Sequence, residues 1–189
     1  VTSFFLIKNK CLFVEQHNPE KLEFKNRENI AVLNAPCGNV IIELYPNVAP
    51  KSVERFKFLI KKGEYNNVAF HRVIKNTLVQ AGDLEFGKKN NLNYSYIGSG
   101  KSGYGSINSE LNYPFEFTAG TVALARTNQK NTEDSQFFIL LVDAPLYQGE
   151  YSPVGKVIFG LDVLRKIKFD EKVEYVLRPD FINTFKLLK

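Results

Sequence analysis

The sequence of 189 residues contains no tryptophan, no methionine, two cysteines and two histidines. Two cysteines are too few for a disulfide framework, and Cys11 and Cys37 do not form a C-x-x-C motif. Because so few soft ligands are present, we expect no metal site. A single Cys11–Cys37 bridge stays open as an alternative to two free thiols.

The sequence also lacks any apolar run approaching the roughly 18 residues of a membrane span, so we expect none. The net charge is +5, but the lysines are scattered, which indicates a solvated surface and no nucleic-acid partner. We therefore expect a soluble domain, cytoplasmic by default. Because the sequence begins at Val1, an organellar or secretory origin with a removed N-terminal segment stays open.

Phenylalanine is abundant, with sixteen residues, and nine tyrosines accompany it. A chain of this length can bury a core without disulfides or metals, and we expect that core to be rich in phenylalanine. We expect one domain over residues 30–189, preceded by an N-terminal extension over residues 1–29. The apolar runs SFFLI (3–7) and CLFV (11–14) make this extension a candidate hairpin.

Hydrophobic patterns over the remaining chain favour strands. Two apolar runs flank Pro36–Asn39, and a helix is predicted from Pro50 to a C-cap at Gly63. After a long polar region over 84–117, further strands are expected at 120–126, 135–143, 152–160 and 181–188, with a short helix at 160–167. Because strands and helices do not alternate, the order favours a mainly β fold: an antiparallel sheet closed into a barrel and capped by two α-helices.

The segment FHRVIKNTLVQAGD (70–83) places an arginine and a glutamine in an apolar strand pair. A two-residue loop would set Arg72 opposite Val79, whereas a three-residue loop ending at Thr77 would set it opposite Gln80. In the second register Arg72 and Gln80 form a polar pair framed by apolar side chains. The alternative is an arginine at a sheet edge with its head group in water.

The segment SQFFILL (135–141) repeats this design, because Gln136 and Phe138 share one face of the strand. An apolar pocket rimmed by arginine and glutamine fits a proline ring with its flanking amides. GSGKSG (98–103) lacks the first glycine of a P-loop, and no nucleophile–base pair accompanies His71. The sequence therefore indicates neither a phosphate site nor covalent chemistry.

FHRVIKNTLVQAGD, GSGKSGYG, GTVALAR, SQFFI and VGKVIFGLDVLRKI, in this order and spacing, resemble the cyclophilins. The resemblance covers residues 30–167. It implies an eight-stranded antiparallel β-barrel with two helices and the activity of a peptidyl-prolyl cis–trans isomerase that assists protein folding without a cofactor. Its partners would be proline-containing segments of client proteins.

The resemblance also implies the site. The catalytic residues would be Arg72, Gln80 and Phe138. The substrate-binding residues would be Thr77, Leu78, Gly98, Ser99, Gly100, Ala125, Arg126, Thr127, Gln136, Leu146 and Tyr151.

Some of these positions differ from the common family pattern. Thr77 stands where an aromatic wall is most frequent, and Leu146 stands in place of a tryptophan, which weakens the expected binding of cyclosporin. Thr77, the insertion over residues 84–97 and the N-terminal extension keep a second hypothesis open: a weakly active or inactive cyclophilin-like module that binds proline peptides as a scaffold.

Overall fold

The computed structural model describes residues 10–189, and most of its regular structure is β-sheet. The strands are β1 (Ile30–Ala35), β2 (Gly38–Leu44), β3 (Arg72–Ile74), β4 (Leu78–Ala81), β5 (Thr121–Leu124), β6 (Phe137–Leu140), β7 (Pro153–Phe159) and β8 (Thr184–Leu187). The helices are α1 (Pro50–Lys61) and α2 (Leu161–Leu164), with short 3-10 turns at Pro19–Lys21, Arg27–Asn29, Lys89–Asn91 and Pro145–Tyr147.

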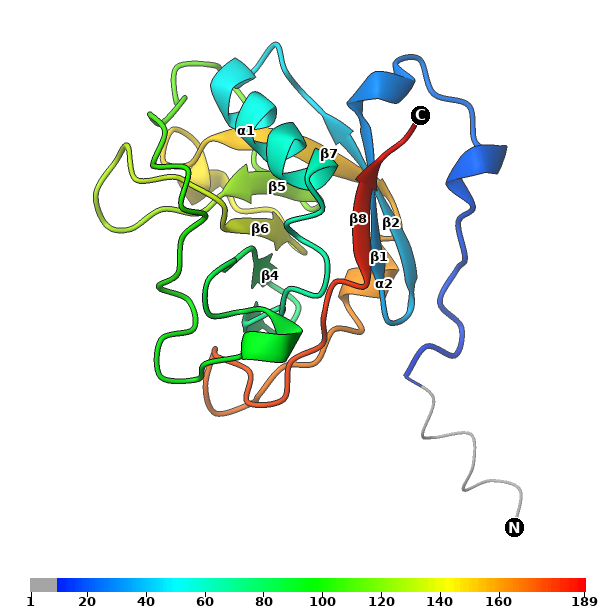
Figure 1. The fold of residues 1–189 in the computed structure, drawn as a ribbon. Coiled ribbons are helices and arrows are strands. Elements are labelled where there is room, and N and C mark those ends of the chain that lie inside the picture. The colour runs from blue at the N-terminus through cyan, green and yellow to red at the C-terminus, as the bar shows by residue number, and fades with distance from the viewer. Residues whose placement is uncertain (1–9) are drawn as a thin grey trace.

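The eight strands form one antiparallel sheet in the order β3-β4-β6-β5-β7-β2-β1-β8 (Figure 1). The expectation of a mainly β fold with eight antiparallel strands and two helices is confirmed. Closure of the barrel is not, because β3 and β8 are the two edges of the sheet and do not pair within residues 10–189. The sheet is a curled half-barrel.

Aromatic rings from distant parts of the chain meet in the core. Phe56 of α1, Tyr65, Phe137 of β6 and Phe185 of β8 lie with ring centroids 5.1 to 6.0 Å apart. Rings at these separations add edge-to-face attraction to the burial of their apolar surface. The core is therefore rich in phenylalanine, as expected, and it joins α1 to both halves of the sheet.

Helix α1 begins and ends where the sequence predicted. Pro50 begins it, and Gly63 follows its end with a φ of 70°, a backbone conformation that favours glycine. The Glu110 carboxylate accepts hydrogen bonds from the backbone N–H groups of Lys51 (3.1 Å) and Ser52 (2.7 Å). A carboxylate from the 84–117 loop thus satisfies two open donors at the helix N-terminus.

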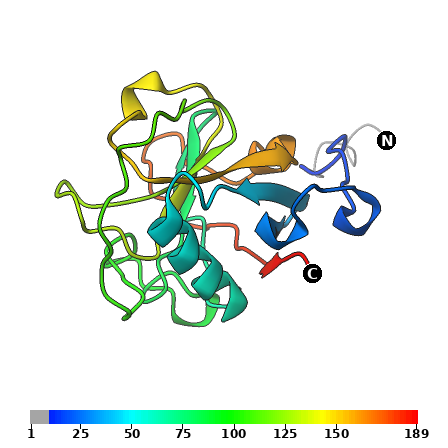
Figure 2. The same ribbon diagram turned by 90° about the horizontal axis from the view of Figure 1, so that it is seen from above.

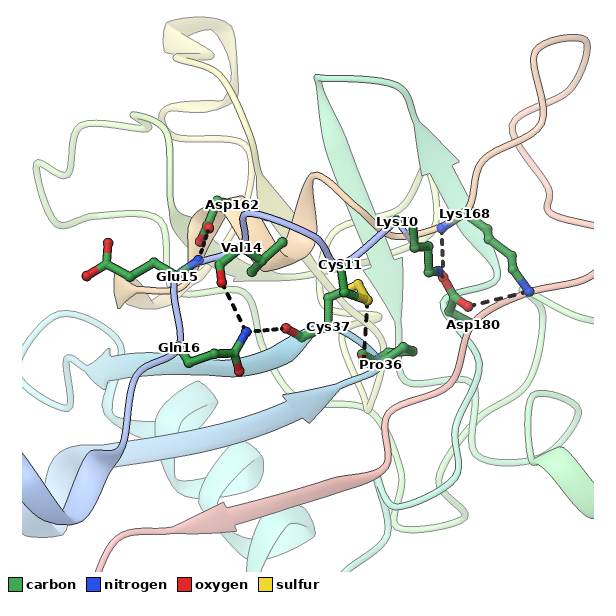
Figure 3. The surroundings of a disulfide bond; sticks show 10 residues. All are labelled: Lys10, Cys11, Val14, Glu15, Gln16, Pro36, Cys37, Asp162, Lys168 and Asp180. Carbon is green, nitrogen blue, oxygen red and sulfur yellow. Dashed lines mark hydrogen bonds and ion pairs between the residues drawn. A yellow bond between two sulfur atoms is a disulfide. The ribbon is translucent and has the colours of Figure 1, made fainter. Parts of the chain in front are cut away.

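The N-terminal extension differs from the expectation. Residues 11–14 form a turn and no strand, while the run SFFLI lies outside the described residues. Cys11 and Cys37 form a disulfide, so two free thiols are the wrong alternative. The bridge fastens the extension to the β1–β2 turn, as Figure 3 shows.

Polar contacts hold the same extension along the domain (Figure 3). The Gln16 side-chain amide donates to the carbonyl oxygen of Cys37 (2.9 Å), and the Glu15 backbone N–H donates to Asp162 of α2 (3.0 Å). Lys10 forms an ion pair with Asp180, whose side chain is buried. The start of the extension therefore packs beside α2 and β1–β2, while at its end the Asn29 side chain accepts a hydrogen bond from Lys57 of α1 (2.6 Å); Figure 2 shows the extension from above.

Candidate functional site

The β3–β4 hairpin places Arg72 directly opposite Gln80. Ile74 pairs with Leu78, so the loop has three residues, and Asn76 within it has a φ of 56°. Asparagine tolerates this left-handed conformation better than most residues. Of the two registers that the sequence left open, the structure has the one with a three-residue loop.

A chain of side-chain hydrogen bonds runs from this hairpin to the neighbouring loop. Arg72 Nη1 donates to Gln80 Oε1 (3.2 Å), and Gln80 Nε2 donates to Gln136 Oε1 (3.0 Å). Gln136 Nε2 then donates to the carbonyl oxygens of Gly98 and Gly100, both at 3.0 Å. Each amide is thereby fixed in one orientation, and the glycine-rich loop is tied to the strands.

These residues border a hollow of about 560 Å³. The predicted site residues that line it are Arg72, Gln80, Gly98, Ser99, Gly100, Ala125, Arg126, Thr127 and Gln136. The structure thus brings together residues from two hairpin strands and two loops that lie far apart in the sequence. Lys101, Asn128, Thr132, Asp134, Ser135 and Tyr175 complete the lining.

The apolar site residues lie beside this hollow, in a separate cluster. Phe138 is only 4% exposed and packs with Leu78, and its ring centroid is 5.0 Å from that of Tyr151 and 5.7 Å from that of Tyr147. Leu146, expected to hold a proline ring, has a side chain that is 88% exposed. Tyr147 is the residue of the Pro145–Tyr147 turn that faces Phe138.

Thr77 ends the hairpin loop and does not line the hollow. Its hydroxyl group donates to the carbonyl oxygen of Lys75 (3.2 Å), so it stabilises the loop. A threonine side chain has little apolar surface for contact with a proline ring.

Asp83 organises the rim of the hollow. Its buried carboxylate accepts hydrogen bonds from four backbone N–H groups, those of Glu85, Phe86, Gly98 and Gly100, at 2.7 to 3.1 Å. A Cβ atom at position 100 would lie 2.0 Å from Asp83 Oδ1, and one at position 98 would lie 2.7 Å from the Tyr175 ring. Both rim positions therefore require glycine.

Arg126 forms the opposite wall. Its guanidinium group donates to the Glu150 backbone carbonyl oxygen and carboxylate, both at 2.9 Å, and lies 5.0 Å from the Tyr151 ring centroid. The neighbouring Thr127 and Thr132 hydroxyl oxygens are 2.9 Å apart. These contacts hold the backbone of residues 125–127 next to the hollow.

His71 lies directly before β3 and is fully buried. Burial lowers the pKa of His71 to about 4, against the opposing effect of the Asp83 carboxylate. The imidazole is therefore neutral at physiological pH.

Two residues next to Arg72 were not foreseen. Glu174 Oε2 accepts a hydrogen bond from Arg72 Nε (2.7 Å), and Tyr175 forms a β-bridge with Arg72 and lines the hollow. Both lie beyond residues 30–167, the range over which the motifs indicated the resemblance. The local pattern around them, EKVEYVL, contains no periodicity that would place them beside β3.

Other kinds of site find little support in residues 10–189. No group of three or more His, Cys, Asp or Glu side chains in this range could hold a metal ion. None of the helices in this range is both long enough and apolar enough to cross a membrane.

A curled antiparallel sheet with an arginine–glutamine pair at its β3–β4 edge defines a known class of protein. The model of the "Cyclophilin type peptidyl-prolyl cis-trans isomerase/CLD" family matches residues 30–185. The chain belongs to this family, as the motifs indicated.

Relatives in sequence and in structure carry the same description. A probable peptidyl-prolyl cis-trans isomerase of Brucella suis is 40% identical over 158 residues, covering 82% of this chain and 80% of that protein. Peptidyl-prolyl cis-trans isomerase B of Escherichia coli is 34% identical over 139 residues, which cover 69% of this chain and 79% of the Escherichia coli protein.

Among solved structures, a Cryptosporidium parvum cyclophilin crystallised in the presence of the dipeptide Ala-Pro superposes with a TM-score of 0.72. It is 26% identical, and the match covers 85% of this chain and 99% of that one. The cyclophilin AquaCyp293 of Hirschia baltica has the same fold, with a TM-score of 0.72, 21% identity and coverage of 86% of this chain and 74% of that one.

Proposed function

We propose that this protein accelerates rotation about X-Pro peptide bonds in client proteins, with Arg72 as the catalytic hydrogen-bond donor. The observation that carries the proposal is the placement of the Arg72 guanidinium group at the edge of a hollow, oriented by Gln80 and Glu174. Family membership supports the same reaction.

The chemistry requires no nucleophile. Amide resonance gives rotation about the bond a barrier of about 18–20 kcal/mol. At the top of the barrier resonance is lost, and the prolyl nitrogen becomes pyramidal and a better hydrogen-bond acceptor. A donor fixed beside this nitrogen stabilises the twisted state more than either planar state, which is the condition for catalysis.

Arg72 has donors left for this task. A guanidinium group carries five N–H groups. In this protein Nε–H donates to Glu174 and one Nη1–H group donates to Gln80, while Nη2 forms an ion pair with the same Glu174 oxygen. The remaining N–H groups of Nη1 and Nη2 form no hydrogen bond with residues 10–189, and we assign one of them to the prolyl nitrogen.

The neighbouring residues would hold the substrate. The apolar cluster around Phe138 and Leu78, with Tyr147 and Tyr151, would pack against the proline ring. Gln80, Gln136 and the backbone of Ala125–Thr127 would bind the flanking peptide groups. The Ala-Pro dipeptide of the Cryptosporidium parvum crystal supports a proline-containing ligand for this site.

Cyclosporin is a weaker candidate ligand. Leu146 replaces the family's frequent tryptophan, and its side chain is 88% exposed. We therefore propose that cyclosporin binds with low affinity.

An isomerisation assay on an X-Pro peptide tests the proposal. We expect the native protein to be about 100- to 1,000-fold faster in kcat/KM than Arg72→Ala, the range found for removal of one transition-state donor. Equal rates would rule out the enzyme hypothesis. Equal rates would instead favour the scaffold hypothesis, in which the protein binds proline peptides without isomerising them.

A further inference from the structure

Glu174, in the tail segment 168–180, contacts the Arg72 guanidinium group. Glu174 Oε2 lies 2.7 Å from Arg72 Nε and 2.6 Å from Nη2, so one carboxylate oxygen bridges the side of the guanidinium group. Gln80 accepts from Nη1 at 3.2 Å. Arg72 and Glu174 are 102 residues apart in sequence, so only the fold brings them together.

Backbone pairing holds Glu174 in place. Its carbonyl oxygen accepts from the Val73 backbone N–H (2.8 Å), and the Val176 backbone N–H donates to the carbonyl oxygen of His71 (2.9 Å). Residues 174–176 thereby pair with the outer edge of β3. The position of Glu174 relative to Arg72 is thus set by the same backbone that carries Arg72.

The segment is fastened again a few residues later. The Asp180 carbonyl oxygen accepts from the Phe70 backbone N–H (2.9 Å), and its buried carboxylate accepts from the Lys168 backbone N–H (2.9 Å). Lys10 and Lys168 form ion pairs with the same carboxylate, as Figure 3 shows. The segment that carries Glu174 is therefore docked at both ends.

Stability alone does not account for this ion pair. The Arg72 and Glu174 side chains are 27% and 53% exposed, and ion pairs at such exposure contribute little to folding. The geometry has another consequence. An arginine side chain has many rotamers, and a carboxylate on the Nε side fixes both the plane and the direction of its remaining donors.

We propose that Glu174 is a positioning residue for Arg72 in the isomerisation reaction. This inference rests on the proposed function. Glu174 holds the guanidinium group from the side away from Gln80, so that its remaining N–H groups keep one direction through the reaction. Preorganised donors of this kind need no reorientation when the peptide bond twists.

The test compares kcat and KM of Glu174→Ala, Glu174→Gln and the control Glu171→Ala. Glu171 lies on the same segment, is 78% exposed and contacts Lys75 at 3.5 Å, away from the hollow. For Glu174→Ala we expect kcat to fall about 10-fold or more with KM within about twofold, because misplaced catalytic groups mainly lose transition-state contacts. Glu174→Gln should recover part of kcat, because its amide oxygen still accepts from Arg72. Glu171→Ala should match the native protein.

Nuclear magnetic resonance gives an independent readout of the contact. We expect the Arg72 Nε–H signal to exchange slowly with water in the native protein and in Glu171→Ala, and quickly in Glu174→Ala. This readout does not depend on enzymatic turnover.

Three outcomes would overturn the inference. An increase in kcat for Glu174→Ala would mean that the carboxylate blocks Arg72. An unchanged kcat would mean that the contact is irrelevant to the reaction. A loss shared by Glu171→Ala, or one that follows a drop in thermal stability and is not recovered by Glu174→Gln, would assign Glu174 a merely structural role. If the native protein is no faster than Arg72→Ala, the proposed function fails first.

Discussion

Gln136 fixes the orientation of Gln80 across neighbouring strands. Gln136 Nε2 donates to two loop carbonyl oxygens, so its Oε1 must accept, and it accepts from Gln80 Nε2 at 3.0 Å. The Gln80 oxygen is then turned toward Arg72, where it accepts from Nη1 at 3.2 Å. The positions of the Gly98 and Gly100 carbonyl groups therefore influence the orientation of the Arg72 guanidinium group through the two glutamine amides.

This relationship predicts the effect of Gln136→Ala. Without the Gln136 oxygen, the Gln80 amide can rotate and present its NH₂ group to Arg72. Two hydrogen-bond donors then face each other, and Arg72 loses the acceptor that orients it. We expect kcat/KM to fall about 10-fold, since displaced catalytic groups lose much of their effect. Steady-state isomerisation of an X-Pro peptide measures it. Gln129→Ala, an exposed glutamine in the same loop region, is the control, and an equal loss in both variants would contradict the role of the relay.

The rim glycines offer a second prediction. Gly98 and Gly103 have φ values of 92° and 81°, so alanine is strained at both positions. A Cβ atom at Gly98 would lie 2.7 Å from the Tyr175 ring, whereas one at Gly103 meets nothing within 4 Å. We therefore expect Gly98→Ala to raise KM for a proline peptide and Gly103→Ala to leave it near the native value. Equal KM values in the two variants would show that backbone strain, and no contact with Tyr175, dominates.

The disulfide predicts a dependence of stability on reduction. Cys11 and Cys37 are separated by 26 positions, and closing a loop of that size in the unfolded chain corresponds to about 3.5 kcal/mol in the chain-entropy account. Adding a thiol reductant should therefore lower the midpoint of thermal unfolding by roughly 10 °C. The double variant Cys11→Ser/Cys37→Ser should unfold at the lower temperature with or without reductant. A native protein insensitive to reductant would contradict the bridge.

His71 predicts a loss of stability in mild acid. Its pKa is about 4 in the folded protein, because burial disfavours the charged ring, and about 6.5 in an unfolded chain. Between these values the unfolded chain binds a proton that the folded protein does not, so stability is fully present above pH 6.5 and declines as the pH falls toward 4. The decline attributable to His71 is roughly 3 kcal/mol.

Urea unfolding at several pH values tests this sign. The difference in unfolding free energy between the native protein and His71→Gln should change by that amount from pH 7 to pH 4, because glutamine does not titrate. His17→Gln retains His71 and should follow the native profile. A difference between the native protein and His71→Gln that is the same at every pH would mean that His71 does not resist protonation.

Local patterns were sufficient to predict the main helix and to reduce the hairpin to two registers. A polar pair in an apolar strand and an asparagine in the loop, all within nine residues, indicated a hairpin with Arg72 opposite either Val79 or Gln80, and the structure has Gln80. The α1 boundaries follow from Pro50 and Gly63 in the same way. A structural element can be predicted from the sequence when the residues that determine it lie close together in the chain.

Long-range contacts explain what was missed. Glu174 reaches Arg72 only because residues 174–176 pair with β3, and no pattern within the tail encodes that pairing. The CLFV run was expected to be a strand because it is apolar, yet Cys11 is held by the bridge to Cys37 in a turn. In the Pro145–Tyr147 turn, Tyr147 contacts Phe138, whereas the Leu146 side chain is exposed to solvent. The sequence had placed Leu146 at the proline ring.

The central claim is that Arg72 acts on the twisted peptide bond and contributes little to ground-state binding. The most direct test measures isomerisation and peptide affinity together in the native protein, Arg72→Lys and Arg72→Ala. We predict that both variants lose about 100-fold or more in kcat while the Kd for a proline peptide changes by less than about threefold, because the lost donor acts mainly in the transition state. A fall in affinity that accounts for the whole loss of activity, or full activity in Arg72→Ala, would contradict the account.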